Sequence, residues 1–433
     1  CISVKPLILS INMIKQACII VGCSIKGLLL LAQHYAYINA DVHLGTGKRI
    51  YPAVLITQQD KIESVQSQQG FKINPTGFDS IIDLQGQQVY PALINPNSIL
   101  GLHDAEAVRA SRDFEDVGVF NPHLRAQRVF NTDNPILPTV RRNGVLITQV
   151  TPRGGRISGQ SSIMSLFGWN WEDATLLKDD GLHLNFPEFP RTTGEAFEKQ
   201  KRIYNQSLDA LTQIWQQAQS YCNAPAALSD IRLSSMCSCI RGTQRLYIHV
   251  HRERDILQAL EWLKKMNVKY PVLVEAEDSW KVSKILARNG IPVLISRVFS
   301  LPDASSDPIE EPFTLAAKLY NDSVCFAFQC SGDMEAMQAR NLSFMAGQSV
   351  SYGLPEEAAI RAMTGHAALI LGINEQWGTL EPGKKACFIV SQGSILDVMT
   401  HRLTRIIWNG RSMPMDSHQE IRAAQYRKKY NLK

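Results

Sequence analysis

The segment that decides the predicted fold is Gln88-Val-Tyr-Pro-Ala-Leu-Ile-Asn-Pro-Asn-Ser-Ile-Leu-Gly101. Its apolar run, residues 89–94, ends in a polar turn that is followed by a glycine, which is typical of a short buried strand. Such a strand delivers the polar residues after it to its carboxyl end. These residues are Asn95, Asn97 and Ser98.

This segment resembles the first barrel strand of the metal-dependent amidohydrolases, in which P-G-(L/F)-I-D-x-H-x-H-(L/I)-G carries the first two metal ligands. Asn97 and Ile99 occupy the two histidine positions here. An asparagine oxygen can bind a hard cation but is a poor zinc ligand, and an isoleucine cannot bind metal at all. The resemblance therefore implies the fold of the family, with its first-strand metal ligands missing.

Length and composition indicate a globular protein. The chain has 433 residues, 45% hydrophobic and 20% charged, with a net charge of +5. It is long enough for one large and one smaller domain, or two mid-sized ones. Basic residues are scattered, which gives no indication of a nucleic-acid partner. The exception is residues 422–433, interpreted as a solvated helix end, with an anionic surface partner as the alternative.

Cysteine spacing argues against a zinc ribbon. Of the nine cysteines, only Cys237 and Cys239 are close in sequence, and no CxxC pair exists. Most of them are therefore interpreted as small buried hydrophobic residues. A disulfide from Cys222 to Cys237 or Cys239 is the pairing that an oxidising compartment would allow.

The N-terminal region favours a secretory signal. Residues 13–33 contain a basic residue and then two apolar runs, both shorter than the about 20 residues that span a bilayer. Ile20-Val21-Gly22-Cys23 also resembles a lipoprotein cleavage box. The predicted location is periplasmic or secreted. If the segment is a lipoprotein signal, the protein is expected to carry a lipid anchor. If the segment is only an upstream extension, the location is cytoplasmic.

The pattern of elements predicts two domains. Short β-rich runs occupy residues 36–84, and Gly378–Val390 and Thr404–Gly410 resemble the motifs that close the family's β-sandwich. Residues 34–90 plus 378–413 are thus expected to form one discontinuous β-sandwich. Between them, residues 91–377 alternate strand-like and helical runs, which favours a parallel sheet closed into a (β/α)8 TIM barrel. Residues 1–33 are the signal, anchor or extension, and 414–433 the basic tail.

Three further motifs resemble strands of the family that carry metal ligands. Leu246-Tyr-Ile-His-Val-His251 matches the fifth strand, so the metal-ligand positions fall on His249 and on His251, which points the same way along an extended strand. Glu275 stands at the histidine position of strand six. Asp333, eight residues before Asn341, matches the aspartate of strand eight, the metal ligand and catalytic base. The alternatives are core or helix-entry histidines, a salt-bridged glutamate and a helix N-cap aspartate. No lysine or glutamate suits strand four.

Residues 148–162, TQVTPRGGRISGQSS, are predicted to form an unusual loop. Three glycines, two arginines and five hydroxyl residues could cradle an anionic ligand, so Arg153, Arg156 and Ser158 join Asn97 as ligand-binding candidates. The alternative is a tight turn that needs positive φ. This run, with Phe120–Ala126 and Trp169–Ala174, resembles a periplasmic, imidazolonepropionase-like branch of the amidohydrolases.

Two functions follow from these resemblances. The first is a hydrolase of a non-peptide carbon–nitrogen bond, such as a cyclic amide, that uses water activated by one divalent metal, zinc or similar. The second is a metal-free relative, or pseudoenzyme, that binds a small molecule at the barrel mouth or partners an active paralogue. A homo-oligomer is the other partner expected, and no segment after the N-terminal region is apolar enough to span a membrane.

Overall fold

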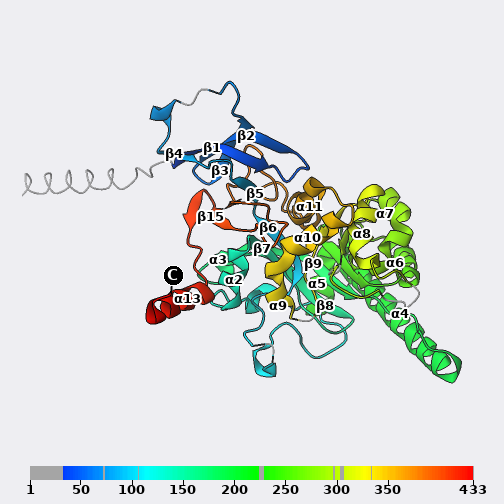
Figure 1. Cartoon of the computed structure of the whole chain (residues 1–433). Coiled ribbons are helices and arrows are strands. Elements are labelled where there is room, and N and C mark those ends of the chain that lie inside the picture. Colours follow the sequence, from blue (N-terminus) through cyan, green and yellow to red (C-terminus); the bar gives the residue numbers. More distant parts are fainter. Residues whose placement is uncertain are drawn as a thin grey trace, which may run out of the picture.

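The computed structural model describes residues 33–71, 74–105, 107–223, 229–295, 298–302, 307–332 and 334–432. These residues form two eight-stranded sheets with helices around one of them (Figure 1). Of the predicted signal or extension, residues 1–33, all but the last residue lie outside the described residues. The predicted base Asp333 lies outside them as well.

One sheet is a nearly closed barrel. Its order is β13-β12-β11-β10-β9-β8-β7-β6, and the edge strands β13 and β6 contact each other. The mixed α/β barrel fold is thereby confirmed. The strands are β6 (Leu93–Ser98), β7 (Val145–Val150), β8 (Ile157–Ser165), β9 (Thr175–Asn185), β10 (Arg245–Val250), β11 (Pro271–Glu275), β12 (Val293–Ile295) and β13 (Phe326–Phe328).

The prediction that this sheet is parallel throughout is wrong at one strand. β8 pairs antiparallel with both β7 and β9. Residues 151–156 alone join β7 to β8, whereas a parallel crossover needs a dozen or more residues. The predicted loop 148–162 is therefore corrected to residues 151–156, because its remaining residues belong to the two strands.

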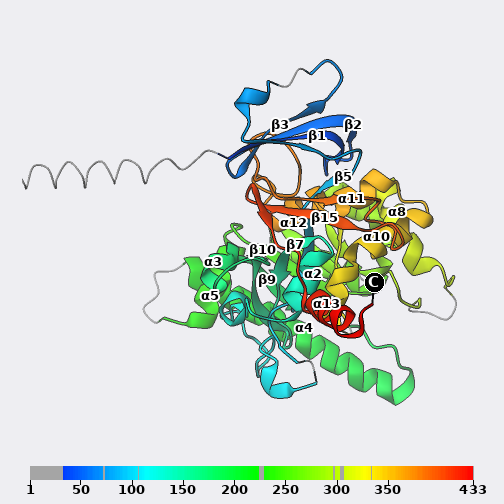
Figure 2. The ribbon, with the colours of Figure 1, turned by 60° about the vertical axis from the view of Figure 1, so that its left-hand side comes forward.

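Helices surround the barrel, and α4 projects from it (Figures 1 and 2). Helix α6 illustrates how the sequence directs this packing, because Ile256 and Leu263 lie on its buried face, as their spacing predicts. Leu257, next to Ile256 in the sequence, is 39% exposed, and Trp262 is buried. The main helices are α4 (Gly194–Asn223), α5 (Ile231–Ile240), α6 (Glu253–Lys265), α7 (Ser283–Asn289), α8 (Glu311–Asn321), α10 (Leu342–Ser351), α11 (Glu356–Met363) and α12 (Gly365–Leu371).

The second sheet joins the two ends of the chain. β5 pairs with β1 and with β14, so the C-terminal strands lie beside the N-terminal ones (Figure 2). The additional β domain from both chain ends is thus present as one sheet, while the exact domain limits stay a prediction. Its strands are β1 (His34–His43), β2 (Arg49–Gln58), β3 (Lys61–Ser67), β4 (Ser80–Asp83), β5 (Gln88–Pro91), β14 (Phe388–Ser391), β15 (Leu403–Trp408) and β16 (Arg411–Met413).

The segment Gln88–Gly101 divides between the two sheets. It was expected to contain one strand but contains two, β5 and β6, which separate at Ala92. The Ala92 N–H donates to the Cys387 carbonyl in the second sheet (3.0 Å), and the Leu93 N–H donates to the Gly144 carbonyl beside the barrel (3.1 Å). This segment therefore couples the two sheets and starts the barrel.

The basic C-terminal residues form helix α13 (His418–Tyr430), which begins with a capping box at Ser417 and has no buried residue. It is held to the barrel side by an ion pair between Arg142 and Glu420 (2.8 Å). In the part of the chain that the structure describes, no helix combines the length and the apolar character needed to cross a membrane.

Candidate functional site

The carboxyl ends of β10 and β11 bring three predicted site residues together. Oε2 of Glu275 lies 3.6 Å from Nδ1 of His249 and 3.4 Å from Nε2 of His251. Glu277, which follows β11, also contacts Nδ1 of His251 at 2.9 Å. Neighbouring parallel strands end at the same edge, so the pairing of β10 with β11 explains this convergence.

A further histidine, His183, belongs to this cluster and was missed in the sequence. It lies on β9, the fourth barrel strand, and its Nδ1 is 3.0 Å from Nε2 of His249. Its ring stacks on Tyr247 at 4.6 Å and is fully buried. The signal that could have identified it is the alternation in Gly181-Leu-His-Leu-Asn185, which places His183 and Asn185 on one face.

The neighbouring groups of this cluster differ in their charge states. Burial lowers the pKa of His249 and lowers that of His183 well below its usual value, so both rings are neutral. Burial alone would raise the pKa of Glu275, but the neighbouring histidines and Arg153 outweigh it and lower this pKa to about 2. The hydrogen bond that His251 donates to Glu277 raises the pKa of His251 to about 9. At neutral pH the cluster thus combines carboxylates, neutral imidazoles and one imidazolium.

The first-strand site is filled by an arginine. Nη1 of Arg153 donates to Oδ1 of Asn97 (2.7 Å), and Nη2 donates to the Asn97 carbonyl (3.0 Å) and to Oε1 of Glu335 (2.6 Å). Nδ2 of Asn97 donates to Oε1 of Gln329 across the seam between β6 and β13 (2.7 Å). Ile99 contributes its backbone N–H to Glu335 (2.8 Å). Both side-chain atoms of Asn97 are therefore engaged by the protein.

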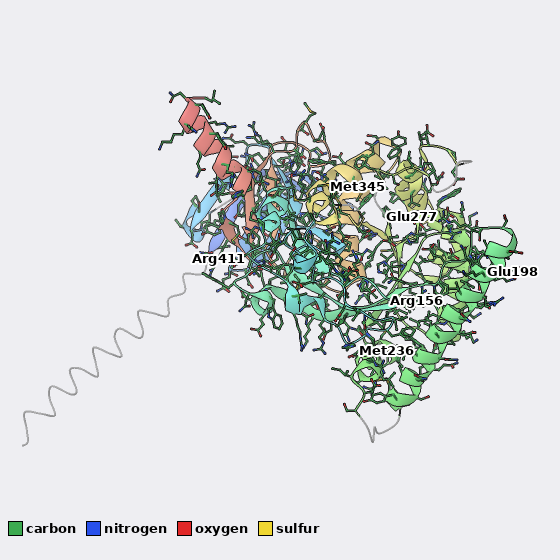
Figure 3. The ribbon with its side chains drawn as sticks, turned by 90° about the horizontal axis from the view of Figure 1, so that it is seen from below. Arg156, Glu198, Met236, Glu277, Met345 and Arg411 are labelled. Carbon is green, nitrogen blue, oxygen red and sulfur yellow. A yellow bond between two sulfur atoms is a disulfide. The ribbon has the colours of Figure 1, made fainter. Side chains whose placement is uncertain are left out.

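The other two ligand-binding candidates gather at the end of β9. Nη1 of Arg156 donates to the Asn185 carbonyl (2.8 Å), and Nδ2 of Asn185 donates to the Ser158 hydroxyl (3.1 Å). Burial lowers the pKa of Arg156. Arg156 and Glu277 are labelled in Figure 3, which views the molecule from below.

Two of these positions have unusual backbone. Asn97 has φ of 50° and Glu275 has φ of 73°, the left-handed region that residues other than glycine rarely adopt. Strain of this kind clusters at functional sites and persists only where the surrounding structure enforces it. The backbone conformation at the ends of β6 and β11 therefore favours a functional role for Asn97 and Glu275.

A buried polar network supports the mouth from inside the barrel. Asp180 accepts hydrogen bonds from Ser161, Gln149 and Tyr247, each 2.8 Å long. Gln149 in turn accepts from the Asn97 N–H (2.9 Å). Burial is the main influence on Asp180 and raises its pKa to about 6, although the three hydrogen bonds oppose it.

This shift makes the free energy of unfolding depend on pH. The folded-state pKa of Asp180 exceeds the unfolded value of 3.8, so its stabilising effect is full below 3.8 and is lost as pH rises through 6. Between pH 4 and pH 7, wild type should lose about 2 kcal/mol relative to Asp180→Asn. Urea unfolding of both proteins at a series of pH values measures this, and parallel pH curves would contradict it.

The predicted metal ligands His249, His251 and Glu275 lie among the described residues, whereas the fourth, Asp333, lies outside them. Among these, no three or more histidine, cysteine, aspartate or glutamate side chains are arranged to hold a metal ion. At the first strand, both side-chain amide atoms of Asn97 are hydrogen-bonded, and the donor to its oxygen is the guanidinium of Arg153. The first strand therefore does not supply the two metal ligands that the family resemblance implies.

Comparisons with known proteins agree with the fold. The model of the amidohydrolase family matches residues 249–412. An amidohydrolase from Thermotoga maritima is 21% identical, with a TM-score of 0.75, over 88% of this chain and 99% of that one. Molinate hydrolase is 12% identical (TM-score 0.55; 89% and 95% covered), and A. niger ochratoxinase is 14% identical (TM-score 0.52; 88% and 95%).

No curated protein sequence matches this chain significantly. At the identities given above, the likeness to solved structures is one of fold, and the family match itself begins at His249. The match to the amidohydrolase family model thus covers residues 249–412, and the barrel has the fold of solved amidohydrolases.

Proposed function

We propose that this chain is a metal-free member of the amidohydrolase fold that binds a small molecule, a cyclic amide or a similar carbon–nitrogen compound, at the carboxyl end of its barrel. The observation that carries this proposal is Arg153. Its guanidinium is hydrogen-bonded to two oxygens of Asn97 and paired with Glu335, beside the first-strand position of the family's metal ligands. The positive charge of Arg153 at this position repels a metal cation. It also pairs with the Glu335 carboxylate.

Unsatisfied polar atoms support an amide as the ligand. Both side-chain amide atoms of Asn95, Nε2 of Gln329 and Nε2 of His183 are buried and have no hydrogen-bond partner among the described residues. Buried polar atoms are nearly always paired with protein, water or ligand. A cyclic amide offers one carbonyl acceptor and one N–H donor, which complement the donors and acceptors of this set.

Hydrolysis of a non-peptide carbon–nitrogen bond is the second candidate. The observation in its favour is the spacing of His249, His251 and Glu275, whose contacts of 3.4 and 3.6 Å are close to the about 3.3 Å between neighbouring zinc ligands with bonds of about 2.0–2.1 Å. A divalent metal held there would lower the pKa of a bound water and supply the nucleophile. This candidate requires the predicted ligand and base Asp333 to complete the site.

Metal content separates the two candidates. Purified protein should contain well under one equivalent of zinc or manganese, and adding either ion should leave its melting temperature unchanged, because Arg153 and the bonded Asn97 disfavour a cation. Elemental analysis and thermal unfolding with and without metal measure this. Stoichiometric metal that is lost in both His249→Ala and Asp333→Ala would overturn the proposal and favour the hydrolase.

The ligand is tested with two cyclic amides, hydantoin and 2-pyrrolidone. At least one should raise the melting temperature of wild type and remain chemically intact by mass spectrometry. Gln329→Met, which removes one unpaired donor, should weaken this binding, whereas Gln217→Met on the far α4 surface should not. Release of the ring-opened product by wild type would contradict the binding-only function.

A further inference from the structure

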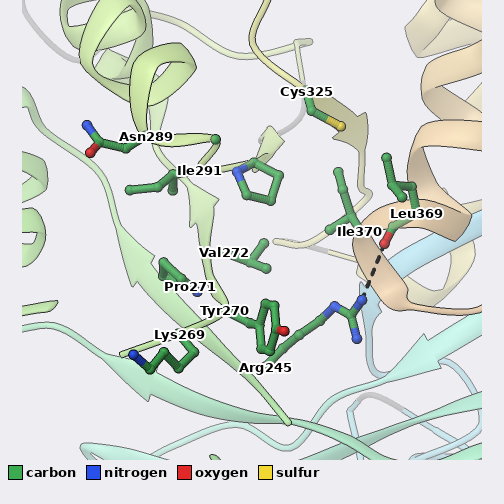
Figure 4. A pocket seen from close by; sticks show the side chains of 12 residues that line it. Arg245, Lys269, Tyr270, Pro271, Val272, Asn289, Ile291, Cys325, Leu369 and Ile370 are labelled. Carbon is green, nitrogen blue, oxygen red and sulfur yellow. Dashed lines mark hydrogen bonds between the residues drawn. The ribbon is translucent and has the colours of Figure 1, made fainter. Parts of the chain in front are cut away.

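A cavity of about 230 Å³ lies at the end of the barrel opposite the candidate site (Figure 4). It is formed where β10, β11, β12 and β13 begin, whereas His249 and Glu275 stand where β10 and β11 end. Its size lies below the roughly 300–1,000 Å³ of sites for drug-sized ligands, so its occupant is small. The residues that define its chemistry are Arg245, Lys269, Tyr270, Ile291, Cys325 and Ile370.

Arg245 is fixed in this cavity but largely unbonded. It is the first residue of β10, and the one hydrogen bond that its side chain makes among the described residues runs from Nη2 to the Leu369 carbonyl at a long 3.4 Å (Figure 4). The guanidinium rests against Gly372, where an added Cβ would lie 2.3 Å from Nη1. A guanidinium has five N–H donors, and no carboxylate among the described residues pairs with this one. Donors are therefore left over for a ligand.

The leftover donors are not explained by the neighbouring helix. Arg245 lies beside the C-terminus of α12, where a cation interacts favourably with the helix dipole. That interaction accounts for the bond to Leu369. It leaves the other N–H groups open, and none of them is among the buried atoms that lack a partner. Because Arg245 lines the cavity, these groups are available to a ligand there.

The cavity is positive on one side and apolar on the other. Lys269 stands at its rim, bonded only to Asn267 (3.1 Å) and turned away from Arg245 (Figure 4). None of the lining residues is acidic. Val272 and Ile370 are buried in the wall, and the Tyr270 ring, 59% exposed, lies next to Arg245 (Figure 4).

We propose that this cavity binds a small organic carboxylate with an apolar or aromatic body. The carboxylate accepts hydrogen bonds from the Arg245 guanidinium, whose planar fork matches its geometry. The apolar body lies against Val272, Ile291 and Ile370, with Tyr270 beside it. Lys269 contributes a weaker, solvent-screened attraction at the rim.

The probe for this site is benzoate, compared with benzamide, which has the same ring but no charge, and with inorganic phosphate, which has charge but no ring. Calorimetric titration of the purified full chain should show benzoate binding at least about tenfold more tightly than either, because benzamide loses the charge-assisted hydrogen bonds and phosphate loses the burial of the ring. Equal binding of benzamide or phosphate would overturn the proposed ligand class.

Variants locate the site. Arg245→Gln should weaken benzoate binding at least about tenfold, and Lys269→Gln by about threefold, because its charge is exposed. Arg411→Gln, which removes an exposed arginine on β16 in the second sheet, should leave it unchanged. Unaltered binding in Arg245→Gln would overturn the assignment.

Cys325 gives a measurement on wild type that does not depend on the folding of a variant. Among the described cysteines outside the disulfide it is the partly exposed one, and Cys239, Cys330 and Cys387 are buried. Burial raises the pKa of Cys325 to about 11, so its modification by methyl methanethiosulfonate is followed at alkaline pH. Saturating benzoate should slow modification of Cys325 at least fivefold by mass spectrometry, roughly the protection expected at occupancy above 80%. No protection at saturation would overturn the site.

Discussion

Replacing Arg153 with methionine should lower the free energy of unfolding by about 3–5 kcal/mol at neutral pH, the usual result of removing one partner from a buried ion pair. The side chain of Glu335 is only 6% exposed and would keep only backbone donors such as the Ile99 N–H. Both oxygens of Asn97 would lose a donor as well. Urea unfolding monitored by circular dichroism measures the loss.

A double variant that also removes the charge of Glu335 tests whether this unpaired charge causes the loss of stability. In Arg153→Met/Glu335→Gln, more than half of the lost stability should return, because a neutral amide can still accept from Ile99. The matched control is Arg125→Met, whose ion pair with Asp179 at 3.4 Å is partly exposed and should cost at most about 1 kcal/mol. Equal losses in the two single variants would contradict the special role of Arg153.

The loss should also depend on pH. Burial already raises the pKa of Glu335, and without Arg153 it should rise further. A carboxyl group with a raised folded-state pKa stabilises the fold below its unfolded pKa and loses this effect as pH rises. The difference between wild type and Arg153→Met should therefore shrink as pH falls from 7 toward 5. If the difference in the free energy of unfolding stays constant with pH, the unpaired charge is not that of Glu335.

The sequence predicts the fold well where the signal is local. The alternation of strands and helices, the amphipathic face of α6 and the motifs at Gly378–Val390 each arise within one element or one hairpin. β8 is different, because its glycine and its hydroxyl residues give it the composition of a loop. Its strand conformation is imposed by pairing on both sides, with β7 and β9, which no local pattern reveals.

The site residues also divide into those that local motifs predict and those that depend on tertiary contacts. His249 and Glu275 belong to adjacent strands with readable motifs, so their meeting could be expected once the barrel was inferred. Arg153 and Glu335 are 182 residues apart, and their pairing depends on how the loop after β7 meets the short helix Glu335–Gln338 that follows β13. The alternation in residues 181–185 could place His183 on one face of its strand. Its approach to His249 depends on the register of β9 against β10, which the sequence does not give. Roles of this kind follow from tertiary contacts, which residue spacing does not encode.

The disulfide bears on where the protein acts. Of the two pairings open from the sequence, the structure forms Cys222–Cys237, between α4 and α5, and leaves Cys239 as a buried thiol. Disulfides persist in oxidising compartments and are rare in the cytosol. The periplasmic or secreted location predicted from the sequence is a compartment in which this pairing would persist.

Removing this disulfide, as Cys222→Ala/Cys237→Ala, should lower the free energy of unfolding by about 3 kcal/mol. The crosslink closes a loop with a sequence separation of 15, and opening it restores that much chain entropy to the unfolded state. Urea unfolding should show reductant shifting wild type to the midpoint of the double variant, while the variant itself does not respond. Cys325→Ala is the matched control and should respond to reductant as wild type does. A wild type that is indifferent to reductant, with Cys222 and Cys237 both open to alkylation, would show that the bond does not form.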